Sequence, residues 1–263
     1  MRAATDCMNL RRTPDPGMSM RKIIINADDF GMNSEINAGI SEAFERGLIS
    51  STTLIVNMPG FAQACELAKR FQLLGKIGIH LNLTEGAPLT ADIRSMTRFC
   101  GPDGRFRPRR ATPYLLPRER AAVENEFNAQ VQACMDRGIR PTHIDSHHHV
   151  HTEWAIGAAA IAVARRNGIH AIRLTRNCGL DISLPKRIYK SAYNLRLRMY
   201  GLAKTSYFGS PSDVHRTIEN SNADIEVEVH PRRNASGTIV ELDGAEFQPQ
   251  IETLGVADLL ASY

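Results

Sequence analysis

Histidine and carboxylate side chains are concentrated in one short stretch of the sequence. Five of the nine histidines lie in the segment HIDSHHHVH, residues 143–151. If this segment is extended, alternate side chains share a face. One face then carries His143, Asp145, His147, His149 and His151, and the other carries Ser146 and His148. Neutral imidazoles beside a carboxylate suit a divalent cation. The alternative is a buried, hydrogen-bonded histidine patch.

Two adjacent carboxylates, Asp28 and Asp29, directly follow the apolar run IIIN. Burying ionised carboxylates is costly unless they are paired or bind a cation. On an extended backbone these two side chains point to opposite sides. We therefore expect different partners for them, such as a metal ion for one and a proton or a cationic side chain for the other. The alternative is that a strand-end aspartate only caps the next helix.

Three further residues lie in similar settings. His80 falls in IGIHLN (77–82), Arg173 in AIRLTR (171–176) and His230 in EVEVHP (226–231). A site with one aspartate and two histidines leaves coordination positions open for water and substrate, as hydrolytic metal centres require. His230 could serve there as a general acid and Arg173 as an electrostatic partner. Alternatively, His80 is a structural histidine, and the other two form surface salt bridges.

These polar clusters share a position in the expected secondary structure. From Arg21 onward, short β-branched runs alternate with helical patterns, which is typical of βαβ units and a parallel sheet. Strands are expected at 22–26, 51–57, 76–82, 170–175, 205–208 and 225–231, and helices near 34–46, 60–71, 118–137, 153–167, 186–200 and 245–261. Roughly seven strand–helix units without a linker favour a single α/β domain over residues 21–263, a distorted (β/α) TIM-like barrel. The clusters should converge where its strands end.

The composition is that of an ordinary soluble globular protein, with 43% hydrophobic and 23% charged residues among 263. It argues against disordered, collagen-like and disulfide-scaffold classes. The net charge of +4 does not imply a nucleic-acid partner.

Five scattered cysteines without a C-x-x-C pair indicate a reducing, cytoplasmic location. The first twenty residues lack the apolar run of a secretory signal, so we expect residues 1–20 to be a disordered tail.

Taken together, these motifs resemble those of the YdjC-like (ChbG) carbohydrate deacetylases, which are related in mechanism to NodB-type polysaccharide deacetylases. The resemblance runs from about Lys22 to His230 and is carried by INADDFG, EAFERGLISSTTLIVN, IGIHLNLTEGAPL and PTHIDSHHHVH. It implies a metal-dependent hydrolase on a distorted barrel that removes an N-acetyl group from an amino sugar. The substrate would be an oligosaccharide or glycoconjugate, with chitooligosaccharide suggested first. The cofactor would be one divalent ion, Mg or Zn, with Co or Mn also admitted.

The resemblance also assigns roles to individual residues. It implies that Asp29, His80 and His147 hold the metal ion and that Asp28 is the catalytic base. His230 matches a late His-Pro motif, where we expect the general acid, and Arg173 would keep Asp28 ionised. Extended geometry leaves His149 and His151 open as replacements for His147. No residue is assigned to an organic cofactor.

The motifs assign no role to two other regions of the chain. The loop at 97–113 contains TRFCGPDGRFRPRR, and its many arginines have no assigned role. The stretch 186–204 is basic and helical in pattern. A solvated outer barrel helix is the favoured interpretation of this stretch, and contact with an anionic membrane surface is the alternative.

Two other function classes compete with the deacetylase. Aspartate and histidine clusters at barrel strand ends serve several chemistries, so another metal hydrolase, a phosphoesterase or an amidohydrolase, is one alternative. A non-catalytic carbohydrate-binding barrel is the other. The sequence does not predict an oligomeric state.

Overall fold

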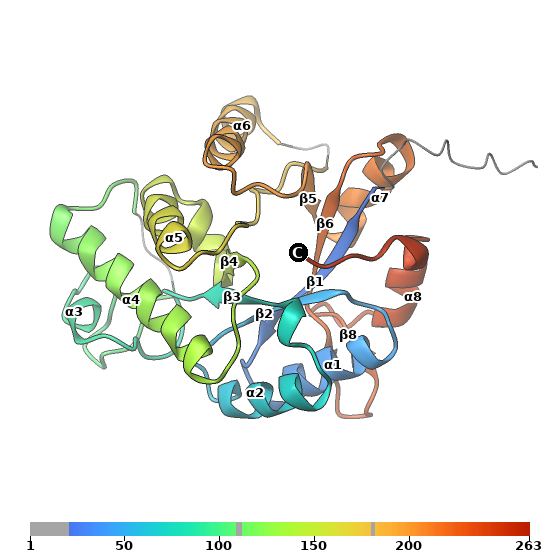
Figure 1. Cartoon of the computed structure of the whole chain (residues 1–263), viewed down its shortest axis with the longest axis horizontal. Helices are drawn as coiled ribbons and strands as arrows, with labels where there is room; N and C mark the ends of the chain where they lie inside the picture. Colours follow the sequence, from blue (N-terminus) through green and yellow to red (C-terminus); the bar gives the residue numbers. More distant parts are fainter. Residues whose placement is uncertain (1–20, 109–111, 180–181) are drawn as a thin grey trace, which may run out of the picture.

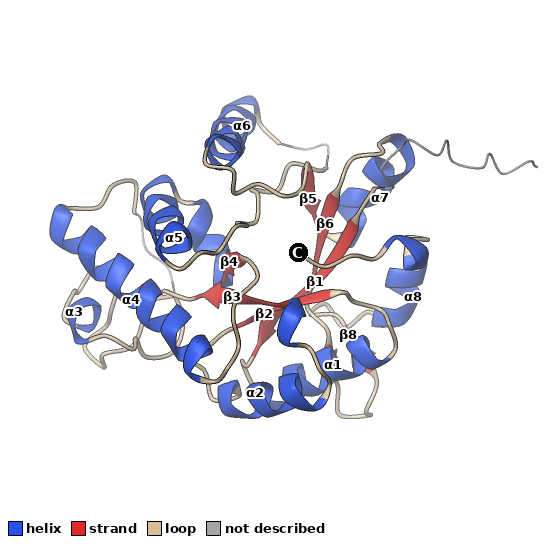
Figure 2. Cartoon of the chain, viewed as in Figure 1, coloured by secondary structure: helices blue, strands red, loops and turns tan. Residues whose placement is uncertain are grey.

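The computed structural model describes residues 21–108, 112–179 and 182–263. Six parallel strands form one curled sheet in the spatial order β4-β3-β2-β1-β6-β5, and helices surround its convex side (Figures 1 and 2). The expected N-terminal tail, residues 1–20, lies outside the described residues. The structure therefore has the expected mixed α/β architecture, but a complete barrel of seven units is not confirmed.

The strands are short and centred on β1. Their bounds are β1 (Ile23–Phe30), β2 (Ser51–Leu54), β3 (Ile77–Leu81), β4 (Ile144–Ser146), β5 (Tyr207–Gly209) and β6 (Ile225–Val229). Every residue of β1 is buried, as expected for a parallel strand covered on both faces. Because all six strands run the same way, their carboxyl ends meet along one edge of the sheet.

Helices connect the strands and enclose the sheet. Their bounds are α1 (Ser34–Glu45), α2 (Phe61–Arg70), α3 (Ala91–Arg94), α4 (Pro117–Asp136), α5 (Trp154–Arg166), α6 (Leu184–Met199), α7 (Pro211–Asn220) and α8 (Phe247–Glu252). Helix α1 begins after Asn33, whose side chain accepts a hydrogen bond from the Ile36 amide. It ends before Gly47, which has a φ of 67°. Among the described residues, no helix is long and apolar enough to cross a bilayer.

Two expected elements differ in the structure. Residues 170–175 form no strand of the main sheet, and a single bridge from Ile172 to Ile144 represents the expected pairing. The expected helix at 245–261 is limited to α8 and a 3-10 turn at Ala257–Leu259. Gly255, with a φ of 63°, breaks the helical path between them. A small hairpin of β7 (Arg232–Arg233) and β8 (Ile239–Val240) and the helix α7 were not expected from the sequence.

Residues 170–178 occupy the space between the two edge strands. The amide of Arg173 donates to the Ile144 carbonyl on β4 at 2.9 Å. The amide of Asn177 donates to the Phe208 carbonyl on β5 at 3.1 Å. This irregular segment thus links the edges of the curled sheet and carries Arg173 to its concave side.

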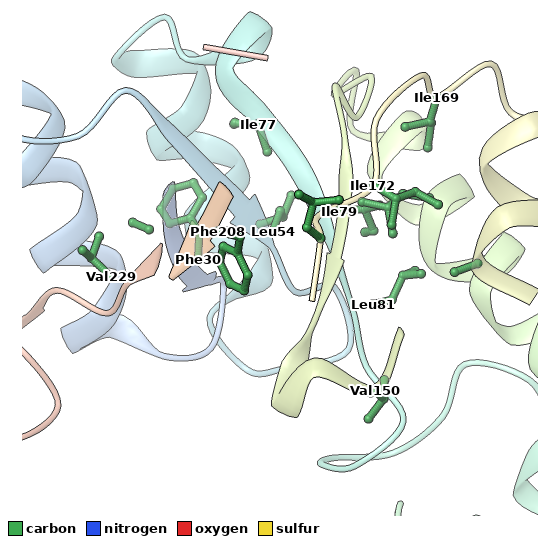
Figure 3. Packing of buried hydrophobic residues seen from close by; sticks show 14 of the residues in the cluster. Phe30, Leu54, Ile77, Ile79, Leu81, Val150, Ile169, Ile172, Phe208 and Val229 are labelled. Carbon is green, nitrogen blue, oxygen red and sulfur yellow. The ribbon is translucent and has the colours of Figure 1, made fainter. Parts of the chain in front are cut away.

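Apolar side chains fill the layer between the sheet and the helices, where Phe30, Leu54 and Ile79 are fully buried (Figure 3). The concave side of the sheet has a different character. Its largest fully buried side chain is that of Arg173. Barrel interiors are usually filled by branched apolar side chains. Replacing them with a polar network sacrifices packing energy, which is typical of a functional site.

Residues near 260 return to the sheet beside β1. The amide of Ala261 donates to the Ile23 carbonyl at 2.9 Å, and Figure 1 places this segment inside the curve of the sheet. The ring of Tyr263 then stacks on His143 with a centroid separation of 3.8 Å. Tyr263 therefore fills part of the concave side of the sheet, next to His143.

Candidate active site

A bulge at the end of β1 sets the directions of the paired carboxylates. The pairing of β1 with β2 shifts register between Ala27 and Phe30, and Asp29 has a left-handed φ of 68°. Such a conformation is uncommon for a residue other than glycine and often marks a functional position. Because of this bulge, Asp28 and Asp29 do not diverge as on an extended strand. Both reach one cluster centred on His80.

The two carboxylates nevertheless have different partners, as the sequence predicts. One oxygen of Asp29 lies 3.1 Å from Nε2 of His80 and 2.8 Å from Nδ1 of His147. The candidate ligand atoms of these three residues lie within 4.8 Å of one another. The structure thus brings together the three residues expected to hold a metal ion. Each is buried.

His80 is held in place from behind by Asp145 on β4. Nδ1 of His80 lies 2.7 Å from Oδ1 of Asp145, and the hydroxyl of Thr53 donates to Oδ2 of Asp145 at 2.9 Å. Burial lowers the pKa of His80, but the charges and hydrogen bonds of Asp145 and Asp29 outweigh it and raise the pKa well above its usual value. In metal centres, a histidine typically binds the metal ion through one ring nitrogen and a carboxylate through the other. His80 and Asp145 have the histidine–carboxylate part of this arrangement.

The segment after β4 is not extended, contrary to the alternating pattern expected for it. Residues His147–Thr152 form a 3-10 segment, in which His148 and His149 both have a φ of 53°. This kink separates the histidines. His149 contacts Glu228 at 3.2 Å, while Nδ1 of His151 lies 2.6 Å from the Ser146 hydroxyl. In the structure, His147 is thus the member of the segment that lies beside Asp29.

Asp28 is bound by Arg173 through two hydrogen bonds. The terminal guanidinium nitrogens lie 2.6 and 2.7 Å from the two oxygens of Asp28, and the Asn26 amide donates to Oδ1 at 2.9 Å. Burial raises the pKa of Asp28, but the charge and hydrogen bonds of Arg173 hold the pKa well below its usual range. Asp28 is therefore an ionised carboxylate in a buried setting.

Negative charge exceeds positive charge in this buried network. Its carboxylates are Asp28, Asp29, Asp145, Glu226 and Glu228, all buried. Arg173 is the fully buried cation among them, with its Nε 2.6 Å from Glu226 and one terminal nitrogen 2.9 Å from Asp145. Burial raises the pKa of Glu226 to about 7, although Arg173 opposes the shift. A buried excess of carboxylates favours the binding of a further cation.

His230 follows β6 at the mouth of the site. Its Nε2 lies 4.0 Å from Oδ2 of Asp28, and its Nδ1 lies 3.4 Å from Glu241. Burial lowers the pKa of His230, but the hydrogen bond with Glu241 and the charge of Asp28 raise it to about 9. His230 is therefore protonated near neutral pH, as a proton donor must be.

A cavity of about 580 Å³ opens beside the buried network. It is lined on one side by His149, Thr175 and Phe208, and on the other by residues of α6. Arg176, also in the lining, forms ion pairs with Glu228 and Asp213. The cavity is large enough for part of a small molecule.

The described part of the arginine-rich loop does not enter the cluster. Arg98 pairs with Glu119 at 2.8 Å. Arg107 donates to backbone carbonyls of its own loop.

The same loop supports the turn that carries Glu85, because the amide of Phe106 donates to the Gly86 carbonyl at 2.8 Å. The carboxylate of Glu85 lies 3.2 Å from Nε2 of His147. Residues 109–111 of this loop lie outside the described residues.

Several site residues were not assigned roles from the sequence. Asp145 was visible within the histidine-rich motif, and Glu226 and Glu228 alternate with valines in EVEV. Two glutamates on one face of an otherwise apolar strand were a signal for buried carboxylates. Tyr263, whose hydroxyl donates to Glu226, gave no such signal because its position depends on the tertiary path of the chain.

The chain matches a known protein family and several named proteins in sequence. A family model described as YdjC-like protein matches residues 22–248. The chain is 34% identical over 212 residues to a chitooligosaccharide deacetylase of Klebsiella pneumoniae, covering 80% of this chain and 81% of the relative. It is 43% identical over 135 residues to a carbohydrate deacetylase of Halalkalibacterium halodurans, covering 50% of this chain and 54% of the relative. The matched region spans about half the length of this second relative and others like it.

A solved structure shares the fold. A putative cellobiose-phosphate cleavage protein from Enterococcus faecalis superimposes with a TM-score of 0.69 at 25% sequence identity. The superposition covers 93% of this chain and 98% of the other. The curled sheet is therefore an arrangement that a solved protein of similar size also adopts.

Proposed function

Because the chain belongs to the YdjC-like protein family, we propose that it is a metal-dependent carbohydrate deacetylase that hydrolyses the N-acetyl group of an amino sugar. Relatives that carry the names carbohydrate deacetylase and chitooligosaccharide deacetylase support this activity. The observation that carries the proposal is the contact of Asp29 with both His80 and His147, beside an ionised Asp28.

The residues fit a divalent cation in that triangle. Asp29, His80 and His147 offer one oxygen and two ring nitrogens, a donor set that suits Zn and its neighbours. Without a cation, both nitrogens of His80 face carboxylates, so a proton is held where a metal ion would otherwise bind. A bound divalent ion would supply Lewis-acid chemistry, polarising the acetamide carbonyl and easing deprotonation of water.

The other residues supply proton transfer and orientation. Asp28, kept ionised by Arg173, accepts the proton of the attacking water. His230, which lies near Asp28 and carries a proton near neutral pH, donates that proton to the leaving amine. Asp145 fixes the ring of His80, and Glu85 contacts the far nitrogen of His147.

The charge pattern favours one metal ion over the paired ions of many phosphoesterases. A second group of potential ligands, Asp28, His80 and Asp145, shares His80 with the first. In this group one terminal nitrogen of Arg173 already lies 2.6 Å from Asp28 and 2.9 Å from Asp145. The guanidinium thus occupies the place where a second cation would bind.

Release of acetate from N-acetylated oligosaccharides tests the proposed function. The wild-type chain, supplied with Zn or Mg, should release acetate, and Asp28→Asn should lose turnover while still binding the metal ion. Full activity in Asp28→Asn would remove Asp28 from the mechanism. Sugar binding without acetate release by the metal-loaded wild type would favour the carbohydrate-binding alternative.

A further inference from the structure

Helix α6 presents an apolar row that no part of the described chain covers. Four of its side chains are between 55 and 78% exposed, namely Leu184, Ile188, Leu195 and Met199. At about 100° per residue these positions share one face of the helix. The residues that α6 buries, Tyr193, Asn194 and Leu197, lie on the opposite face. Figure 1 shows α6 at the periphery of the molecule.

Cationic side chains flank this apolar row. Helix α6 contains no acidic residue, and its basic residues are Lys186, Arg187, Lys190, Arg196 and Arg198. By helical spacing, Arg187 and Arg198 lie along one border of the apolar row, and Arg196 lies along the other. Among described residues, Arg187 and Arg198 form no ion pair with a carboxylate. Their charge is therefore available to an anionic partner.

Aromatic residues lie on this helix and beside it. Trp154, Tyr189 and Tyr200 are each between 41 and 48% exposed. The rings of Trp154 and Tyr189 lie 6.4 Å apart, and the Arg196 guanidinium lies 4.8 Å from the Trp154 ring. Amphipathic aromatic rings are favoured at the boundary between lipid and water.

We infer that α6 is a docking surface for an anionic lipid bilayer. A basic helix with an apolar row and neighbouring aromatic rings binds in the plane of such a surface, because apolar burial and attraction to anionic headgroups add together. A second copy of this chain fits less well, since two such helices face to face would bring like charges together. We therefore adopt the alternative interpretation of this basic stretch, contact with an anionic membrane surface, over a merely solvated helix.

Docking through the apolar row would place the active-site cavity near the membrane, on the side of α6 that faces away from the bilayer. The α6 residues Lys186, Tyr189 and Lys190 line that cavity together with His149. If the proposed deacetylase function holds, an acetylated sugar that extends from the lipid surface by one helix diameter, roughly 10 Å, would reach the site. This extension rests on the proposed function, whereas membrane docking does not.

Vesicle sedimentation with the full chain tests the docking surface. Vesicles of phosphatidylcholine mixed with phosphatidylglycerol should bind the chain, more strongly at low salt, and vesicles of phosphatidylcholine alone should bind it much less. The variant Ile188→Gln/Leu195→Gln/Met199→Gln should bind at least about tenfold more weakly. Arg187→Gln/Arg198→Gln should also lose about tenfold. As a matched control, Leu74→Gln/Leu242→Gln removes exposed apolar residues elsewhere and should bind as the wild type does.

Three results would overturn the docking surface. These are no binding to the anionic vesicles at low salt, undiminished binding by the apolar-row variant, and a dimer that dissociates when the apolar row is replaced. Because the replaced side chains are exposed, thermal unfolding of each variant should match the wild type. Acetate release from a soluble sugar is measured in parallel. Vesicle binding without acetate release would count against the proposed function alone.

Discussion

Arg173 binds both oxygens of Asp28 through two terminal nitrogens, at 2.6 and 2.7 Å, and its side chain is completely buried. The same guanidinium contacts Glu226 through Nε. A planar fork of this kind fixes the orientation of a carboxylate as well as its charge. Asp28 is thereby held as a base with its pKa far below neutrality.

We expect Arg173→Lys to lower kcat by roughly a hundredfold with a smaller effect on KM, because a lysine ammonium cannot hold Asp28 at two points. The pKa of Asp28 should rise at the same time, since its bidentate partner is lost. The acid limb of the pH–kcat profile therefore moves to higher pH. Steady-state kinetics across pH measures both effects. A variant with wild-type kcat and an unmoved acid limb would show that Arg173 does not position Asp28.

Metal binding should occur at one site per chain. Calorimetric titration of metal-stripped protein with Zn should give one ion per chain, and His80→Ala or His147→Ala should weaken binding strongly because each removes a candidate ligand. Asp145→Asn should weaken it by about 10–100-fold, since it removes the carboxylate that orients His80. The control is His149→Ala, because His149 contacts Glu228 and not Asp29. Two ions per chain would instead favour the phosphoesterase alternative.

Part of the candidate site can be predicted from the sequence. Alternating strand and helix patterns predict that Asp28 and His80 fall at strand ends, and parallel topology predicts that they converge. The direction of Asp29 could not be predicted, because it depends on a left-handed bulge that no local pattern marks. Similarly, the periodicity of the histidine segment suggested an extended strand, whereas the kink at His148 decides which ring faces Asp29.

The part of the fold that the sequence does not predict also depends on tertiary structure. Residues 170–175 have the composition of a strand, but only Ile172 bridges β4, because the segment crosses from one edge strand toward the other. Whether a segment pairs with a strand depends on the path of the chain in the folded protein. The sequence pattern gives only the segment's local preference for extended backbone.

His230 should titrate near pH 9 in metal-stripped protein, as followed by NMR of its imidazole ring. Glu241→Gln removes the hydrogen-bonding carboxylate that raises this pKa, so the value should fall toward that of an ordinary histidine, about 6.5. If His230 is the general acid, kcat falls as pH rises through its pKa, and Glu241→Gln shifts this alkaline limb to lower pH. An alkaline limb that stays in place in Glu241→Gln would argue for another proton donor.

Tyr263 connects the segment near residue 260 to the catalytic network. Its hydroxyl donates to Glu226, which accepts from Nε of Arg173, and its ring stacks on His143. Tyr263→Phe keeps the stacking surface but removes the donor, leaving a buried carboxylate oxygen with one partner fewer. We expect the free energy of unfolding to fall by about 1–3 kcal/mol.

The pH dependence of this loss identifies its cause. The pKa of Glu226 in the folded state, about 7, lies above its ordinary value of 4.5, so the folded state binds more protons and stability falls as pH rises between these values. Removing the Tyr263 donor raises the folded pKa further. The stability deficit of Tyr263→Phe should therefore be small near pH 5 and grow as pH rises through 7. Denaturant unfolding of metal-stripped protein at several pH values measures this, and a deficit independent of pH would mean that Tyr263 acts through packing on His143 instead.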